Sequence, residues 1–226
     1  QKYAIDTLLA QAGNRTDERT GAVSTPIFLS TAYGHHGIGE STGFDYTRTK
    51  NPTRAVLEET IAQLEKGERG FACSSGMAAI QLLMSLFTAP DEWIVSSDVY
   101  GGTYRLLDFC YKNTHGVKPV YVNTASVQAI EAAITPNTKA IFIETPSNPL
   151  MEECDVDAIA QVAKRHNLLL IVDNTFLTPM LFRPMAHGAD IVVHSGTKYL
   201  AGHNDVLVGL IIAKGKELCE FYEKVC

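Results

Sequence analysis

The segment Ala189–Leu200, ADIVVHSGTKYL, combines an apolar strand with an abrupt polar turn. Its β-branched run, Ile191–Val193, is typical of a strand that is covered on both faces. The following residues, Ser195–Thr197, are small, form hydrogen bonds readily and suit a turn. The segment therefore predicts that a buried strand ends here and that the turn presents Lys198 at the edge of a sheet.

A lysine in this setting has two interpretations. Its amine can form a Schiff base with a phosphorylated aldehyde while the hydroxyls of Ser195 and Thr197 bind the phosphate. A single lysine after a strand is more often simply exposed to solvent, and the segment by itself favours that second interpretation. The choice depends on what the rest of the chain places at the same edge.

Length and composition exclude several classes of protein. The chain has 226 residues, of which 46% are hydrophobic and 19% charged, so it can form one large α/β domain or two small ones. The net charge is −6 and the basic residues are scattered, which argues against nucleic acid as a partner. No apolar run is long enough to span a membrane and no secretory pattern is present, so we expect no membrane association.

The cysteines indicate a reducing compartment. There are five of them, widely spaced and without a C-x-x-C pair, so we expect neither a disulfide framework nor a zinc site. The seven histidines form no helical metal-binding pattern with acidic residues, so no metal is expected. The expected location is the cytoplasm.

From residue 51 onward, short apolar runs alternate with amphipathic segments. Strands are expected at residues 71–73, 93–95, 117–122, 139–144, 168–173, 191–194 and 206–212. Helices are expected near residues 51–67, 77–87, 103–111, 127–134, 156–166 and 216–224. This alternation predicts an α/β fold with a mostly parallel seven-stranded sheet sandwiched by helices.

Residues 1–50 have a different character. A short helix is expected near residues 5–11, and frequent glycines prevent longer regular elements after it. Such a segment buries little of its own surface. We therefore expect an extended N-terminal arm that crosses the surface or wraps around a neighbouring subunit.

Polar residues follow several predicted strands, at the edge where ligands bind in parallel sheets. The turn Ser75–Met77 opens directly into a helix, so its free N–H groups and the helix dipole suit a phosphate, as an ordinary strand-to-helix turn also could. Asp173 closes an apolar strand and could either keep a pyridine nitrogen protonated or cap the next helix.

Two aromatic residues are further candidates. Tyr100 stands beside Gly101 and Gly102, so its ring could stack on a planar cofactor or could belong to the core. Tyr46 and Arg48 alternate in the arm, so in an extended segment they point the same way and could bind a phosphate or face solvent.

Six motifs occur together in the order and approximate spacing of one known family. They are YxRxxNPT at 46–53, SGM at 75–77, YGG at 100–102, ETPSNP at 144–149, VDNT at 172–175 and HSGTKY at 194–199. On these motifs the chain resembles the Cys/Met-metabolism enzymes that depend on pyridoxal 5′-phosphate (PLP). That family includes cystathionine γ-synthase, the cystathionine γ- and β-lyases and the O-acetylhomoserine sulfhydrylases.

The resemblance implies roles for individual residues. Lys198 would form the Schiff base with PLP, Asp173 would pair with the pyridine nitrogen, Tyr100 would stack on the ring, and Asn148 would lie near the phenolic oxygen. The residues implied for the phosphate are Ser75, Gly76 and Met77, assisted by Ser195 and Thr197. Lys198 would also act as the base at Cα, with Tyr100, and Tyr46 as a second candidate, as the acid for the leaving group.

The resemblance also implies an assembly. Tyr46 and Arg48 would reach the phosphate of an adjacent subunit, so active sites would be shared in a homo-oligomer, a dimer of dimers or homotetramer. Residues 1–50 would be the arm that contacts the neighbouring subunit, and residues 51–226 the PLP-binding large domain of fold type I. Family members continue into a smaller C-terminal domain whose arginine binds the substrate α-carboxylate, and no residue of this chain maps to it.

The implied reaction is trans-sulfuration of a small amino-acid substrate in methionine biosynthesis. Gly102 stands where methionine γ-lyases typically carry a cysteine, which argues against that enzyme. Residues 37–46 are most similar to bacterial cystathionine γ-synthases that also accept sulfide. We therefore expect γ-replacement on O-acyl-homoserine by cysteine or sulfide. The alternatives are cystathionine γ- or β-lyase and an inactive fragment that only binds PLP.

Overall fold

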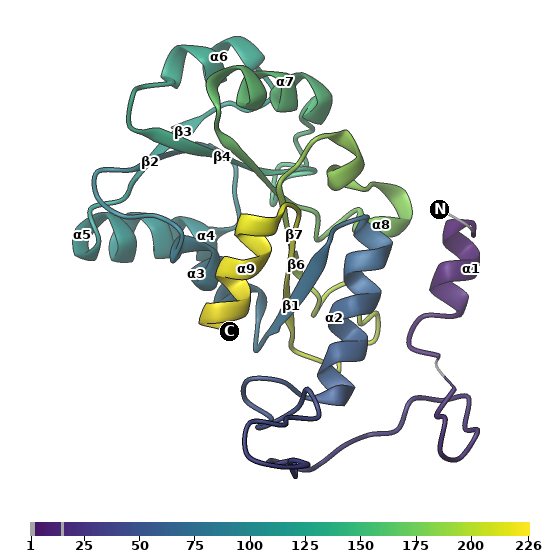
Figure 1. Ribbon diagram of the computed structural model, residues 1–226. Coiled ribbons are helices and arrows are strands. Elements are labelled where there is room, and N and C mark those ends of the chain that lie inside the picture. The colour runs from purple at the N-terminus through teal and green to yellow at the C-terminus, as the bar shows by residue number, and fades with distance from the viewer. Residues whose placement is uncertain (1–2, 15) are drawn as a thin grey trace.

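Apolar strands form the centre of the molecule, as their sequences predict. In the computed structural model, which describes residues 3–14 and 16–226, seven strands join in the order β1-β7-β6-β5-β4-β2-β3 (Figure 1). Strands β2 to β6 pair in parallel, whereas β7 is antiparallel to both β1 and β6. The strands are β1 (Arg69–Cys73), β2 (Glu92–Ser96), β3 (Lys118–Val122), β4 (Thr138–Glu144), β5 (Leu169–Asp173), β6 (Ile191–Ser195) and β7 (Gly209–Ala213). The expected mostly parallel seven-stranded sheet is confirmed.

Helices connect these strands and cover both faces of the sheet (Figure 1). The longer ones have the capping residues that their sequences suggest, such as Asn51 and Asp155 at their N-termini. The helical elements are α1 (Ile5–Ala10), α2 (Pro52–Glu65), α3 (Gly76–Met84), α4 (Gly101–Arg105), the π-helix η1 (Leu106–Tyr111), α5 (Lys112–Thr114), α6 (Val127–Ala133), α7 (Val156–His166), α8 (Thr178–Leu181), the 3-10 helix η2 (Pro184–His187) and α9 (Lys216–Val225).

Two hydrophobic cores lie on opposite faces of the sheet. One packs α3, η1 and α9 against the strands, and the other packs α2, α6 and α7. Along β6, Ile191 and Val193 belong to the first core and Val192 to the second, and all are at most 1% exposed. Both faces of this strand are therefore buried, which explains why its sequence is continuously apolar.

Some element boundaries differ from those predicted. The last strand begins at Gly209 rather than at residue 206, because Val206 and Leu207 are exposed and lie in a loop. The expected helix at 103–111 is divided between α4 and η1, and α5 continues the helical segment to Thr114. The short elements α8 and η2, each with a proline in its first turn, were not predicted.

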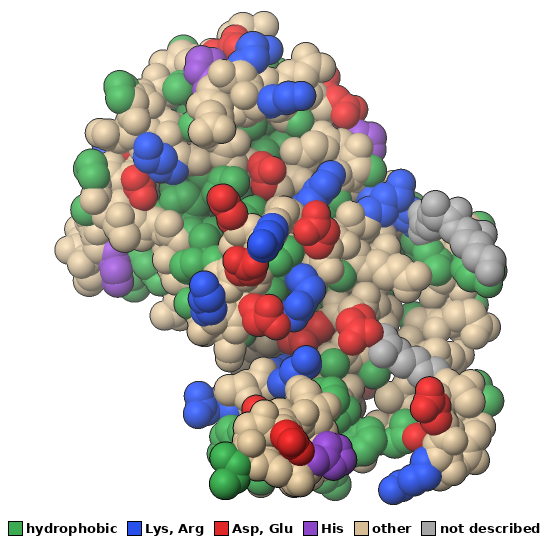
Figure 2. All heavy atoms as spheres, in the orientation of Figure 1, with side chains coloured by type: hydrophobic (Ala, Val, Ile, Leu, Met, Phe, Trp, Pro, Cys, Tyr) green, Lys and Arg blue, Asp and Glu red, His purple; other side chains and the backbone are tan. Residues whose placement is uncertain are grey.

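The N-terminal segment forms the expected arm, although residues 1, 2 and 15 of the predicted 1–50 range lie outside the described residues. Apart from α1 it contains turns and isolated bridges, such as the one between Ala32 and Tyr46. Figure 2 shows much of it set off from the body of the molecule. Ile27, Leu29 and Ile38 are exposed on it. Within the described ranges, no helix has the length and apolarity needed to cross a membrane.

Candidate active site

A cavity opens where the carboxyl ends of β4, β5 and β6 meet the start of α3. Its volume is about 160 Å³. Every candidate cofactor residue predicted outside the arm lines it: Ser75, Gly76, Met77, Tyr100, Asn148, Asp173, Ser195, Thr197 and Lys198. The parallel arrangement of β4 to β6 places their polar ends side by side, and this is the physical reason that residues distant in sequence converge here.

The turn before α3 is built for an anion. Ser75 caps the helix, its side chain accepting a hydrogen bond from Ala78 N at 3.1 Å, and the N–H groups of Gly76 and Met77 have no partner within the helix. A Cβ at Gly76 would lie 2.8 Å from the Cβ of Ser195, so only glycine allows the turn to approach the end of β6 this closely. The result is a concave backbone surface with a positive dipole end.

Asp173 is a buried carboxylate at the end of β5. Its Oδ1 accepts hydrogen bonds from Thr175 N at 3.0 Å and Thr175 Oγ1 at 2.5 Å. Burial raises the pKa of the Asp173 carboxyl above its ordinary value, although the Thr175 hydrogen bonds and nearby His194 act in the other direction. A carboxylate in this position gains from a cationic partner in the cavity.

The turn that carries Lys198 is held on both sides. Ser195 N donates to Thr175 Oγ1 at 2.9 Å, which links the end of β6 to the residue that hydrogen-bonds Asp173. Lys198 N donates to Ser195 O at 3.1 Å. The Thr197 hydroxyl accepts from Val208 N at 3.1 Å and lies 3.3 Å from Val208 O, so it is already engaged by the approach to β7. These contacts fix the backbone from which the Lys198 side chain enters the cavity.

Glu144, at the end of β4, also lines this cavity, and sequence reasoning gave it no role. Its Oε2 accepts a hydrogen bond from Tyr100 N at 2.8 Å and so fixes the start of α4, where the tyrosine ring is presented. Burial raises the pKa of the Glu144 carboxyl to about 8, and repulsion from Asp173 is the second largest cause of this shift. The sequence showed only that Glu144 ends an expected strand, and its register with Asp173 at the end of β5 is known from the fold.

A second unpredicted cluster lies beneath the cavity. His194 Nε2 is 2.6 Å from Glu65 Oε1, and Asn174 Nδ2 donates to the same oxygen at 2.8 Å. All three side chains are at most 1% exposed. Since β6 and α2 are far apart in sequence, only the fold reveals that the glutamate at the end of α2 is buried against this histidine.

Tyr46 and Arg48 are not at the cavity of their own chain. Both are exposed on the arm, and the Arg48 guanidinium carbon lies 5.6 Å from the centre of the Tyr46 ring. The two side chains therefore lie together, as their spacing predicts. Their assignment to the phosphate of an adjacent subunit remains a prediction.

The chain is therefore an α/β protein with a lysine, a buried aspartate and a helix N-terminus at one edge of its sheet. Residues 6–225 match the family described as Cys/Met metabolism PLP-dependent enzyme, and the chain belongs to that family.

Similar proteins have related names. The chain is 84% identical, over 97% of its length, to cystathionine gamma-synthase of Haemophilus influenzae, and 61% identical, over 96%, to cystathionine gamma-synthase/O-acetylhomoserine (thiol)-lyase of Bacillus subtilis. It spans only 60% and 58% of the lengths of these two curated relatives. The crystal structure of cystathionine gamma-lyase from Lactobacillus plantarum, complexed with L-serine, superimposes with a TM-score of 0.95 at 46% identity, covering 99% of this chain and 58% of that one.

Proposed function

We propose that the protein containing this chain is a PLP-dependent enzyme of the cystathionine γ-synthase type. In this reaction cysteine, or sulfide, replaces the acyloxy group at Cγ of an O-acyl-homoserine. The observation that carries the proposal is the 84% identity to the Haemophilus influenzae cystathionine gamma-synthase, against 46% identity to the structurally similar gamma-lyase. Elimination by a cystathionine lyase is the second candidate, since a cystathionine gamma-lyase has the same fold at 46% identity.

The chemistry of the cavity fits PLP. The buried carboxylate of Asp173 suits a protonated ring nitrogen, which would lower its raised pKa. The glycine-dependent approach of Gly76 to Ser195 forms a backbone cradle for the phosphate, and Ser75 and Met77 belong to the same turn. Lys198 supplies the amine for a Schiff base with the cofactor aldehyde, and Asn148 faces the same space from the loop after β4.

The residues of this chain divide the work of the reaction. When bound, PLP supplies a ring that stabilises negative charge at the substrate Cα. With PLP bound, Lys198 Nζ would take the proton from Cα, and the Asp173 carboxylate would keep the ring nitrogen protonated. Tyr100, whose backbone is fixed by Glu144, would stack on the ring and give a proton to the leaving group, with Tyr46 as a second candidate for that proton transfer.

The arm and the body have separate roles in this proposal. Residues 51–226 are the PLP-binding large domain, and residues 1–50 contact a neighbouring subunit, where Tyr46 and Arg48 bind the phosphate. The support is that both side chains are exposed, lie together and are not at the cavity of their own chain. The assembly is then a homo-oligomer with shared sites, as a dimer of dimers. The five free cysteines agree with a cytoplasmic enzyme.

Absorbance and product analysis on the full-length protein test the proposal. The protein with PLP should be yellow, and Lys198→Ala should lose the colour. O-acetyl- or O-succinyl-homoserine with cysteine should give cystathionine, whereas cystathionine alone should give little pyruvate or 2-oxobutyrate. A protein that stays colourless with PLP refutes the enzyme assignment, and rapid keto-acid release without cystathionine synthesis assigns a lyase instead.

A further inference from the structure

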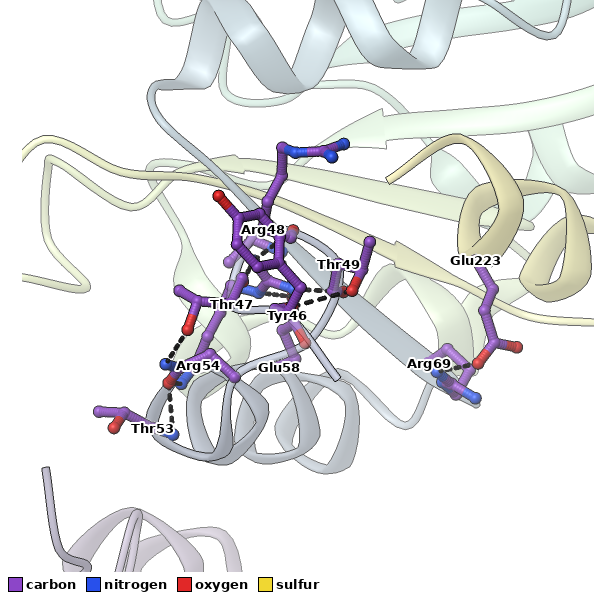
Figure 3. Close-up of polar contacts among 11 residues, drawn as sticks. Tyr46, Thr47, Arg48, Thr49, Thr53, Arg54, Glu58, Arg69 and Glu223 are labelled. Carbon is purple, nitrogen blue, oxygen red and sulfur yellow. Dashed lines mark hydrogen bonds and ion pairs between the residues drawn. The ribbon is translucent and has the colours of Figure 1, made fainter. Parts of the chain in front are cut away.

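The turn that presents Tyr46 and Arg48 is held by one side chain from α2. Arg54 Nη1 donates to the carbonyl oxygens of Thr47 and Arg48, at 3.2 and 3.1 Å. Its Nη2 donates to Thr49 O at 2.7 Å. Figure 3 shows the Arg54 guanidinium at this turn, with the Arg48 side chain extending away from it. Three consecutive backbone carbonyls are therefore fixed by a single planar group.

The preceding carbonyl is held as well. Tyr46 O accepts from Thr49 N at 3.1 Å, from Lys50 N at 2.9 Å and from Thr49 Oγ1 at 2.8 Å. With the contacts of Arg54, the four carbonyls of residues 46–49 are thus all occupied. The backbone is fixed while the side chains of Tyr46 and Arg48 remain exposed, and this arrangement suits a pair that must meet a ligand outside its own chain.

Arg54 is itself fixed to the sheet through Glu58. The two side chains form an ion pair at 3.2 Å between Nε and Oε1, without the alignment of a hydrogen bond. Glu58 Oε1 also accepts a hydrogen bond from Ala72 N of β1 at 3.0 Å. Strand β1 ends at Cys73, two residues before Ser75, which caps α3. These contacts therefore connect the turn at residues 46–49, which would reach the neighbour's phosphate, to the turn at residues 75–77, which would hold the phosphate of this subunit.

We propose that Arg54, held by Glu58, is a positioning residue that sets Tyr46 and Arg48 for the PLP phosphate of the adjacent subunit. This role rests on the proposed function of those two residues. A lysine at position 54 keeps the charge and can pair with Glu58, but a compact ammonium cannot reproduce the planar fork across three carbonyls. The geometry of the turn is then lost while the local charge is retained.

The test compares PLP with pyridoxal, which lacks the phosphate. In the full-length protein, Arg54→Lys should weaken PLP binding on the order of tenfold, as the loss of one to two hydrogen bonds implies. Pyridoxal binding should be unchanged, because the turn acts only on the phosphate. Visible absorbance during titration of the cofactor-free protein measures both affinities.

Two further variants complete the design. Arg48→Ala should weaken PLP binding, and adding Arg54→Lys to it should cause a smaller loss than Arg54→Lys causes alone, since of the two residues that Arg54 positions only Tyr46 then remains. The matched control is Arg69→Lys, because Arg69 pairs with Glu223 at 3.2 Å on the surface and does not touch the turn (Figure 3). It should bind both compounds as the unmodified protein does.

The outcomes separate the two hypotheses. If Arg48→Ala binds PLP normally, the phosphate role of the arm is wrong and the role of Arg54 falls with it. If Arg48→Ala weakens binding but Arg54→Lys does not, only the positioning role is wrong. Equal losses for PLP and pyridoxal, additive losses in the double variant, or dissociation of the subunits in light scattering would also overturn it.

Discussion

Replacing Asp173 by asparagine tests the most specific feature of the cavity. The side chain is 8% exposed, and the strand end that carries it is fixed by Thr175. The amide has the same shape and can still accept from Thr175 N, but it carries no charge. The variant therefore removes the interaction with a protonated ring nitrogen while it leaves the architecture of the cavity in place.

The substitution is expected to weaken PLP binding but to make the cofactor-free protein more stable at higher pH. A hydrogen bond to a charged group contributes about 1.5–3 kcal/mol, and about 1.4 kcal/mol corresponds to a factor of ten, so PLP should bind about 10- to 100-fold more weakly to Asp173→Asn. Without PLP, burial holds the pKa of the Asp173 carboxyl above its ordinary value of 3.8, so its ionisation opposes folding. The free energy of unfolding of the cofactor-free protein should therefore fall as pH rises above about 3.8, and the variant should lose that part of the decline.

The assays are absorbance titration with PLP and urea unfolding of the cofactor-free protein at several pH values. Asp190→Asn is the matched control, because Asp190 is also partly buried with a raised pKa but precedes β6 at the opposite edge, where it accepts from Leu170 N at 2.9 Å. It should leave PLP affinity unchanged. The reasoning is refuted if Asp173→Asn binds PLP as tightly as the unmodified protein.

Three further variants probe the surroundings of the cavity. The pKa of Glu144 is raised from 4.5 to about 8, so its ionisation also opposes folding. The free energy of unfolding of the cofactor-free protein should therefore decline between those pH values, and Glu144→Gln should flatten this decline. Parallel pH profiles for the two proteins would contradict this. Gly76→Ala places a Cβ 2.8 Å from the Cβ of Ser195, so we expect the free energy of unfolding in urea to fall by about 1–3 kcal/mol and PLP to bind more weakly. If both quantities are unchanged, the close approach of the two residues is unimportant. Glu65→Ala removes the buried hydrogen-bond partner of His194 and Asn174 and should cost about 1–3 kcal/mol in the same unfolding assay, whereas no measurable loss would show that the contact contributes little.

Much of the cavity could be predicted from sequence because its residues follow apolar strands. Local patterns made Ser75, Asp173 and Lys198 candidates only, and their positions at strand ends that meet at one edge of a parallel sheet, together with the family motifs, selected them. Glu144 occupies the same kind of position, but a glutamate after a strand carries no distinctive local signal. Glu65 could not be found at all, since a glutamate near the end of an amphipathic helix is ordinarily exposed.

The sequence by itself determined the α/β class, the number of strands, the extended arm and the family, because these depend on local periodicity, turn residues and motifs in order. It did not determine that β7 runs antiparallel between β1 and β6, because an apolar run such as Leu210–Ile212 suits a buried strand of either direction. Tertiary structure also decided the raised pKa of Glu144 and the three-carbonyl contact of Arg54. Burial and hydrogen-bond geometry depend on segments that meet only after folding, and no local pattern in the chain records them.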